Sequence, residues 1–118
     1  MKSILYVNRR APSSSGLARE ALDAALASAV FEQQLSILWM DDGVFQLLNN
    51  SAQQSASDLQ KNLKALGLYG IEQLYVHQPS LTQRGIDKSQ LIAELDVELL
   101  DDQQVAALFQ QQQQIISF

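Results

Sequence analysis

The fold is decided by the stretch SILYVNRRAPSSSG at residues 3–16 and by the change of pattern that follows it. Residues 3–7 form a short apolar run with β-branched and aromatic side chains, which is typical of a strand buried on both faces of a parallel sheet. Pro12 and the serines after it indicate a turn, and serine hydroxyls suit the cap of a helix. From Leu17 to Val30 the apolar residues recur every three or four positions, which predicts an amphipathic helix.

Four further strands are predicted along the chain. Apolar runs at residues 35–40 and 71–76 resemble the first run, so both are expected to be buried strands. Residues 93–99 alternate between apolar and charged side chains, which fits a strand with one face in water. Residues 115–118 close the chain as a terminal strand.

Helices and loops are predicted between these strands. The apolar spacing predicts three more helices: a short one over residues 44–48 that begins at Asp41 and Asp42, one over residues 58–66 that ends at Gly67, and one that begins at Asp101 and Asp102. Residues 49–57 are rich in Ser and Gln and are expected to form an exposed loop. Residues 77–85 are also interpreted as a loop, with a turn at Arg84 and Gly85.

Strands that alternate with helices over residues 1–118 predict a single domain of the α/β class. We expect a three-layer α/β/α sandwich around a mainly parallel sheet of about five strands. In such sheets, ligands bind in the loops at the carboxyl ends of the strands. Function is therefore expected in four loops, which follow Val7, Met40, Val76 and the strand near Val97.

The composition excludes several classes of function. The chain has 13 acidic and 8 basic residues, a net charge of −5 and a pI near 4.6, so direct binding to a nucleic acid is disfavoured. It has no cysteine, which excludes disulfides, thiolate metal sites and a persulfide carried on this chain. A single histidine also argues against a zinc site. We expect no metal and no cofactor.

No segment has the pattern of an export signal or a membrane span. The apolar run at residues 4–7 stops at Asn8, Arg9 and Arg10. No run approaches the roughly 18 apolar residues that a membrane-spanning helix needs. We therefore expect a cytoplasmic protein.

The first loop offers a weak phosphate-binding pattern. Arg9 and Arg10 supply charge, and Ser13, Ser14 and Ser15 supply hydroxyls in front of a helix, as in a phosphate or flavin site. The same serines also suit an ordinary helix start, and no later loop supplies an aromatic slot for a flavin. Helix capping is the favoured interpretation, and a small flavin- or phosphate-binding module stays the alternative.

The second and third loops carry the other candidate catalytic groups. Asp41 and Asp42 could bind Mg²⁺ or share a proton, although two acidic residues are also typical of a helix start. His77 is a candidate acid or base, but no serine or cysteine nucleophile stands in an evident motif with it. An enzyme in its own right is therefore the least favoured class of function.

Several segments together resemble one family. The chain is similar to the TusC/DsrF family of sulfur-relay subunits in an order that runs collinearly from Met1 to Phe118. DGVFQLL is the most specific of these segments. The similar segments are NRRAP at residues 8–12, AREALDA at 18–24, DGVFQLL at 42–48, LGLYGIEQ at 66–73 and IISF at 115–118.

The resemblance implies a DsrEFH-like fold and a place in a heterohexamer with two copies of each of three homologous subunits. The partners would be a TusB/DsrH-like and a TusD/DsrE-like subunit. The Tus complex relays persulfide sulfur between carrier proteins towards 2-thiouridine at the wobble position of tRNA. A related Dsr complex serves sulfur oxidation instead.

In the active sister subunit of this family, the carrier cysteine follows the third strand, eight residues before a glycine. The same count back from Gly85 reaches His77, and imidazole cannot form a persulfide. The resemblance therefore implies a non-carrier subunit that acts through contact and not as an enzyme.

Contacts with the partner subunits are predicted at apolar residues next to loops. A place in the core of this chain is the alternative interpretation for each of them. The predicted contact residues are Val44, Phe45, Leu48, Leu68 and Tyr69.

Overall fold

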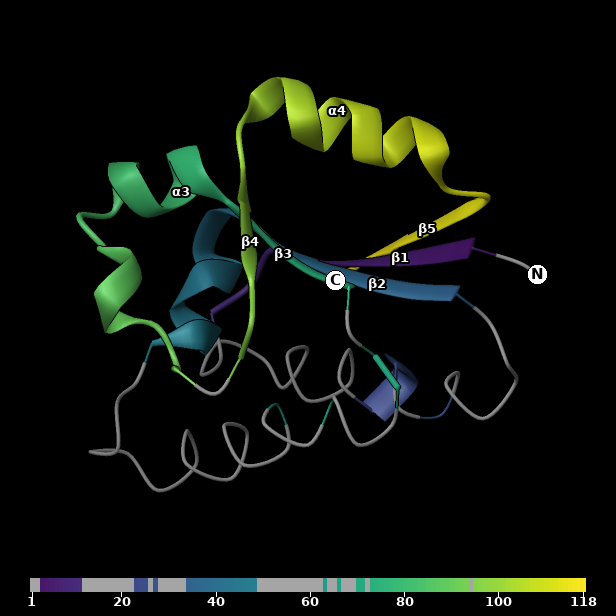
Figure 1. Cartoon of the computed structure of the whole chain (residues 1–118), viewed down its shortest axis with the longest axis horizontal. Coiled ribbons are helices and arrows are strands. Elements are labelled where there is room, and N and C mark those ends of the chain that lie inside the picture. Colours follow the sequence, from purple (N-terminus) through teal and green to yellow (C-terminus); the bar gives the residue numbers. More distant parts are fainter. Residues whose placement is uncertain are drawn as a thin grey trace.

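A computed structural model describes residues 3–11, 23–25, 27, 34–48, 63, 66, 70–71, 73–93 and 95–118 of the chain. Its centre is a five-stranded sheet in the order β4-β3-β2-β1-β5, in which every strand pair is parallel (Figure 1). The predicted sheet is confirmed. The strands are β1 (Ser3–Asn8), β2 (Gln34–Trp39), β3 (Gln73–His77), β4 (Glu98–Leu100) and β5 (Gln114–Ser117).

The two central strands β1 and β2 are buried on both faces, as their continuous apolar runs predict. They run in register from Ser3 opposite Gln34 to Asn8 opposite Trp39. After their first residue, every residue of both strands is buried. This places the carboxyl ends of β1 and β2 side by side, next to that of β3.

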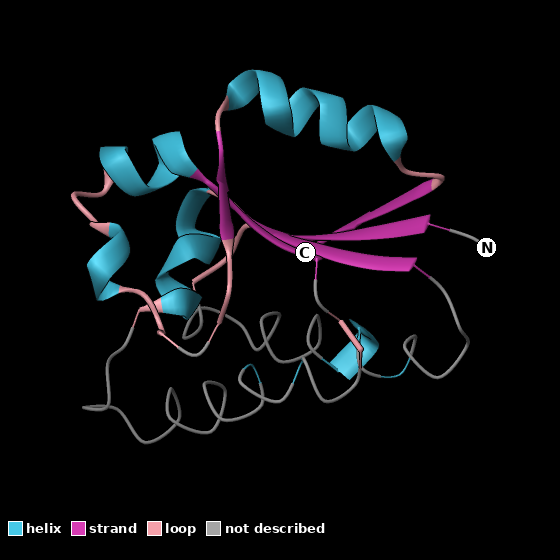
Figure 2. Ribbon diagram, viewed as in Figure 1, coloured by secondary structure: helices cyan, strands magenta, loops and turns pink. Residues whose placement is uncertain are grey.

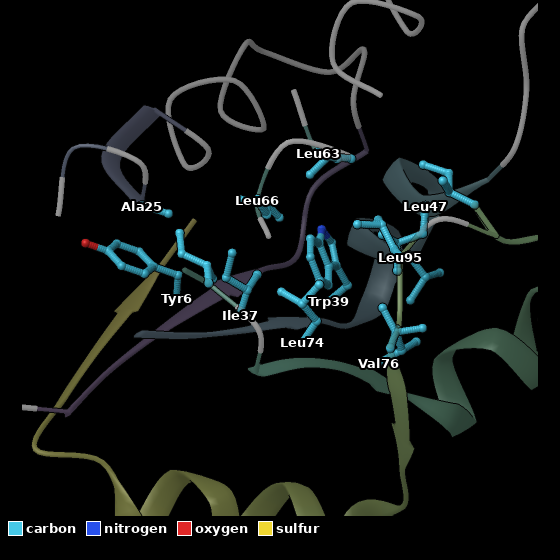
Figure 3. Packing of buried hydrophobic residues seen from close by; sticks show 14 of the residues in the cluster. Tyr6, Ala25, Ile37, Trp39, Leu47, Leu63, Leu66, Leu74, Val76 and Leu95 are labelled. Atoms are coloured by element: carbon cyan, nitrogen blue, oxygen red, sulfur yellow. The ribbon is translucent and has the colours of Figure 1, made fainter. Parts of the chain in front are cut away.

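Apolar clusters lie on both faces of the sheet, as a three-layer arrangement requires. On one face, Trp39 and Ile37 pack with Leu63 and Leu66, which lie between β2 and β3 in the sequence (Figure 3). On the other face lies α4 (Asp102–Gln111) (Figure 2). Leu5 and Leu38 of the sheet pack in one cluster with buried residues of this helix. The helix predicted to begin at Asp101 and Asp102 is confirmed, because the Asp101 side chain accepts a hydrogen bond from the backbone of Gln104.

The short helix predicted after β2 is a 3-10 helix, η1 (Asp41–Leu47). It lies so close to the end of β1 that only glycine fits at position 43. A Cβ atom on Gly43 would lie 1.9 Å from the carbonyl oxygen of Asn8. The same carbonyl accepts a hydrogen bond from the backbone N–H of Met40 at 3.0 Å, so it is held in place. Gly43 therefore allows the close approach of η1 to β1.

Gln46 joins η1 to β2 and to the loop after β1. Its side chain is buried, and its Oε1 accepts a hydrogen bond from Trp39 Nε1 at 3.2 Å. Its Nε2 donates to the carbonyl oxygen of Arg10 at 2.9 Å. Since Trp39 is fully buried, Gln46 supplies the acceptor that the indole N–H needs.

The predicted loop over residues 77–85 is wrong in its first part, because a helix, α3 (Gln78–Gln83), begins directly after β3. Pro79 lies in its first turn, where its missing N–H costs no hydrogen bond. Only Ser80 and Leu81 of this helix are buried. The helix therefore has too few apolar residues at helical spacing to be predicted from the sequence. The predicted turn follows it, with Gly85 at a φ of 65°.

The strand predicted over residues 93–99 is also wrong in its extent, because β4 begins only at Glu98. Leu95 and Val97 are buried in the cluster around Trp39, but the chain reaches that cluster through bends after a short 3-10 helix, η3 (Lys88–Gln90). The backbone N–H of Leu95 donates to the carbonyl oxygen of Ile92. This hydrogen bond closes a turn and does not join two strands. The alternating pattern thus reflects burial without strand pairing.

The two other predicted helices lie largely outside the described residues. Residues 23–25, 27 and 63 are helical, as expected. The predicted loop at residues 49–57 falls outside the described part of the chain. Among the residues that are described, no helix is both long and apolar enough to cross a membrane.

Gly43→Ala is expected to destabilise the fold by about 3 kcal/mol, because the new methyl group forces η1 away from β1. Gly85→Ala is the matched control: it has open space around its Cβ and a φ of 65°, so only the backbone cost of about 1 kcal/mol applies. Urea unfolding of both variants measures the difference. Equal losses would show that the contact between Gly43 and Asn8 is not restrictive.

Gln46→Leu is expected to lower the free energy of unfolding by about 2 kcal/mol, because it leaves the buried indole N–H and the Arg10 carbonyl without partners. Trp39 is the only tryptophan of the chain, so its emission reports the loss directly. Gln110→Leu, at an exposed position of α4, is the control and should change stability by less than about 0.5 kcal/mol. An unshifted emission maximum together with unchanged stability in Gln46→Leu would contradict the assigned role.

Candidate functional site

The carboxyl ends of β2, β3 and β4 bring three polar residues together. His77 is the last residue of β3, Asp41 begins η1 after β2, and Asp102 begins α4 after β4. They meet because parallel strands present their carboxyl ends at one edge of the sheet. This edge is where the sequence predicts function.

His77 is hydrogen-bonded through both ring nitrogens. Its Nδ1 lies 2.6 Å from Ser80 Oγ, and its Nε2 lies 2.6 Å from Asp102 Oδ1. The imidazole is 12% exposed and the Asp102 side chain is 82% exposed, so the chain of contacts runs from the surface inwards. Ser80 reaches the ring because it lies one helical turn after His77, in the first turn of α3.

Ser80 continues the chain of contacts to the backbone of Asp41. Its Oγ accepts a hydrogen bond from the Asp41 N–H at 2.8 Å. Asp41 has a φ of 52°, a left-handed conformation that is uncommon for a residue with a side chain. The Ser80 hydroxyl therefore stabilises the unusual backbone that starts η1.

All these groups are satisfied when the imidazole is neutral. The Ser80 hydroxyl then donates to Nδ1 of His77, and the Nε2–H of the ring donates to Asp102. We call this set of contacts between Asp102, His77, Ser80 and the Asp41 backbone the edge clamp. It holds the segments after β2, β3 and β4 together.

The edge clamp links a serine, a histidine and an aspartate in the order of a nucleophilic triad, but its serine is buried. Ser80 is only 1% exposed, so its hydroxyl cannot reach a substrate. The Ser80 hydroxyl oxygen also accepts a hydrogen bond from the Asp41 backbone N–H, so it is engaged in holding the start of η1. The chemistry that the geometry supports here is positioning.

Two arginines pair with the acidic residues at the start of η1. Arg84 lies 3.1 Å from Asp42 and also donates to the carbonyl oxygen of Ser80 at 3.1 Å. Arg9 lies 4.0 Å from Asp41, and both side chains are about half exposed. Asp41 and Asp42 lie in the first turn of η1, which agrees with the interpretation as a helix start. No group of His, Cys, Asp or Glu suited to a metal occurs among the described residues.

The predicted phosphate loop is only partly described. Arg9 and Arg10 are exposed, and the Arg9 side chain is directed to Asp41. Ser13, Ser14 and Ser15 lie outside the described residues. Asn8, next to this loop, is buried and its Oδ1 has no hydrogen-bond partner. An acceptor oxygen repels a phosphate, so this feature does not add to a phosphate site.

A groove lies beside the edge clamp, between α3 and the start of α4. Its volume is about 390 Å³, and it is lined by Gln78, Pro79, Thr82, Gln83 and Asp101.

On the sheet face that α4 covers, burial raises the pKa of the Tyr75 phenol, and the nearby Glu98 carboxylate raises it further. Tyr75 therefore stays protonated and uncharged.

The predicted partner-contact residues have different surroundings. Val44 is fully buried in the core of this chain. Phe45 and Leu48 are half-buried, and Leu48 forms an isolated antiparallel bridge with Leu91. Leu68 and Tyr69 lie outside the described residues.

The sequence identifies His77 as a candidate but does not predict its partners. Ser80 falls in a predicted loop, and Asp102 in a predicted helix start. A serine three residues after a histidine, at the point where a strand passes into a helix with proline in its first turn, is the signal that indicates the first contact. The contact with Asp102 spans 25 residues and depends on the order of the strands.

The chain is similar to known proteins both in sequence and in fold. The chain is 42% identical over 118 residues to a protein named TusC homolog from Pseudomonas aeruginosa, with 98% of each chain covered. It is 30% identical to the intracellular sulfur oxidation protein DsrF of Allochromatium vinosum, with all of this chain and 97% of that protein covered. The crystal structure of the YchN protein of Escherichia coli has the same fold, with a TM-score of 0.84, 22% identity and full coverage of both chains.

The family model described as DsrE/DsrF-like matches residues 2–118. The match spans the sheet, the edge clamp and the terminal strand β5. The chain therefore belongs to the DsrE/DsrF-like family.

Proposed function

We propose that this chain is the non-carrier subunit of a cytoplasmic sulfur-relay complex of the TusBCD/DsrEFH type. In this complex it stands beside a TusB/DsrH-like and a TusD/DsrE-like subunit, with two copies of each. One observation carries the proposal: a chain similar over its whole length to proteins named TusC and DsrF has no cysteine.

The chemistry of sulfur transfer explains why the missing cysteine matters. A persulfide forms on a thiolate, and transfer requires a second thiolate to attack the outer sulfur. This chain offers neither group, and a thioether of methionine cannot replace them. The sulfur therefore moves on the partner subunits, and this chain contributes shape and contact.

The edge clamp supports the same proposal. His77 takes the position at the end of β3 where the carrier cysteine of a sister subunit is expected, and its ring is bonded on both sides. A residue held in this way fixes the segments around it. We infer that His77 shapes the contact surface and does not take part in the transfer.

The relatives carry two kinds of name, TusC homolog and intracellular sulfur oxidation protein DsrF. The greater identity is to the TusC homolog, at 42%, compared with 30% to DsrF. This difference favours the relay towards 2-thiouridine in tRNA, with sulfur oxidation as the second candidate. The net charge of −5 favours contact with protein partners over direct contact with tRNA.

Co-expression with a TusB/DsrH-like and a TusD/DsrE-like chain is expected to give one particle with two copies of each, measured by native mass spectrometry. Phe45→Ser should weaken assembly at least about tenfold, because it removes a half-buried aromatic side chain from the proposed contact. Tyr75→Ser, a half-buried aromatic on the opposite face of the sheet, is the matched control. A chain that ignores both partners would refute the proposal.

His77→Gln in the assembled complex is expected to leave the rate of sulfur transfer within about twofold, while it lowers the stability of the chain by about 1 kcal/mol through the lost hydrogen bonds. Single-turnover transfer from a persulfide donor and thermal unfolding measure the two effects. Substituting the carrier cysteine of the partner subunit with serine should abolish transfer and serves as the positive control. A tenfold slower transfer in a fully assembled His77→Gln complex would assign His77 a direct part in the reaction.

A further inference from the structure

The groove beside the edge clamp has two different walls. One wall is formed by Gln78, Pro79, Thr82 and Gln83 of α3, and the other by Asp101 at the start of α4. No side chain of α3 is charged, so this wall consists of the proline ring, the threonine side chain and the stems of two glutamines. The groove therefore combines an uncharged wall with an acidic one.

The acidic wall keeps its negative charge within the part of the chain that the structure describes. Asp101 accepts a hydrogen bond from a backbone N–H of α4, and Asp102 accepts one from the His77 ring, which is neutral in the edge clamp. Neither contact supplies a positive charge, and the Asp102 side chain is 82% exposed. Arg84, which follows α3, pairs with Asp42 instead. Two neighbouring carboxylates therefore lie uncompensated at the groove.

The segment that leads into the acidic wall has only one sign of charge. Residues 89–102 contain five acidic residues and no basic one, and no basic residue follows them. Near this segment an anion is repelled and a cation is attracted. A cation with an aliphatic stem satisfies both walls of the groove, because the stem lies on α3 while the charge meets the carboxylates.

We propose that the groove binds an arginine side chain of a partner subunit. Its guanidinium group bonds to Asp101 and Asp102, and its aliphatic stem lies against Pro79. Arginine suits this place better than lysine, because its planar group can bond two carboxylates at once and is more weakly hydrated. The groove volume of about 390 Å³ is at the small end of ligand pockets, which suits one side chain with its neighbouring backbone.

The position of the groove joins this contact to the edge clamp. Gln78 lines the groove and follows His77 directly, and Asp102 belongs to both the clamp and the acidic wall. A buried arginine is a residue type that often supplies much of the binding energy of an interface. The partner subunit would thus be anchored beside the end of β3. The inference rests on the proposed function, because the partner is a subunit of the proposed complex.

Asp101→Asn combined with Asp102→Asn tests the acidic wall, because it removes both charges and keeps the oxygen atoms that cap α4 and bind His77. We expect this variant to bind the two partner chains at least about tenfold more weakly, measured by isothermal titration calorimetry. Asp87→Asn combined with Asp96→Asn is the matched control, since it removes the same charge at exposed positions outside the groove. The control should change the Kd by less than about twofold.

A small probe tests the groove on the isolated chain. N-acetyl-arginine amide at about 10 mM is expected to shift the backbone amide resonances of Thr82, Gln83 and Asp101 in a nitrogen–proton NMR spectrum. N-acetyl-citrulline amide has nearly the same shape without the charge, so it should leave these resonances in place. The Asp101→Asn and Asp102→Asn double variant should respond to neither compound.

The outcomes separate this inference from the proposed function. Equal shifts with both compounds, or a complex whose Kd the double variant leaves unchanged, would overturn the arginine contact and leave the proposed function intact. Failure of the unmodified chain to bind the two partner chains would overturn the proposed function and this inference together.

Discussion

The hydrogen bond from the Asp41 backbone to the Ser80 hydroxyl is the constraint on which the carboxyl edge of the sheet depends. It holds Asp41 in a left-handed conformation, which turns the chain into η1 directly after β2. Only with this turn does Gly43 reach the end of β1 and Gln46 reach the indole of Trp39. A single buried hydroxyl thus fixes where η1 lies and how the first loop is anchored.

The same hydroxyl explains how the groups at this edge hold one another in place. In parallel α/β sheets the carboxyl edge usually binds ligands, because backbone N–H groups and loop side chains are free there. Here His77, Ser80 and Asp102 use their hydrogen-bonding capacity on one another. Polar groups that are satisfied within the chain give a rigid surface, which suits a subunit that acts by contact.

The sequence predicts those parts of the structure that depend on local pattern. Continuous apolar runs predict the buried strands, and the acidic pair at Asp101 and Asp102 predicts the start of α4, because both are local signals. The strand at residues 93–99 was misplaced, because Leu95 and Val97 alternate for reasons of burial while the backbone bends. The contact of His77 with Asp102 cannot be predicted from the sequence, because it exists only once β4 has paired with β3.

The composition of α4 separates two demands on one helix. Its start is acidic, where Asp102 favours the positive end of the helix and binds His77. After that residue the outward positions have no charge, so the helix forgoes the ion pairs between successive turns that stabilise helices exposed to water. A solvent-facing helix gains nothing from that loss, whereas a helix that meets another protein avoids the cost of burying charge. The acidic start of α4 is therefore explained by the internal architecture of the chain, through the contact between Asp102 and His77.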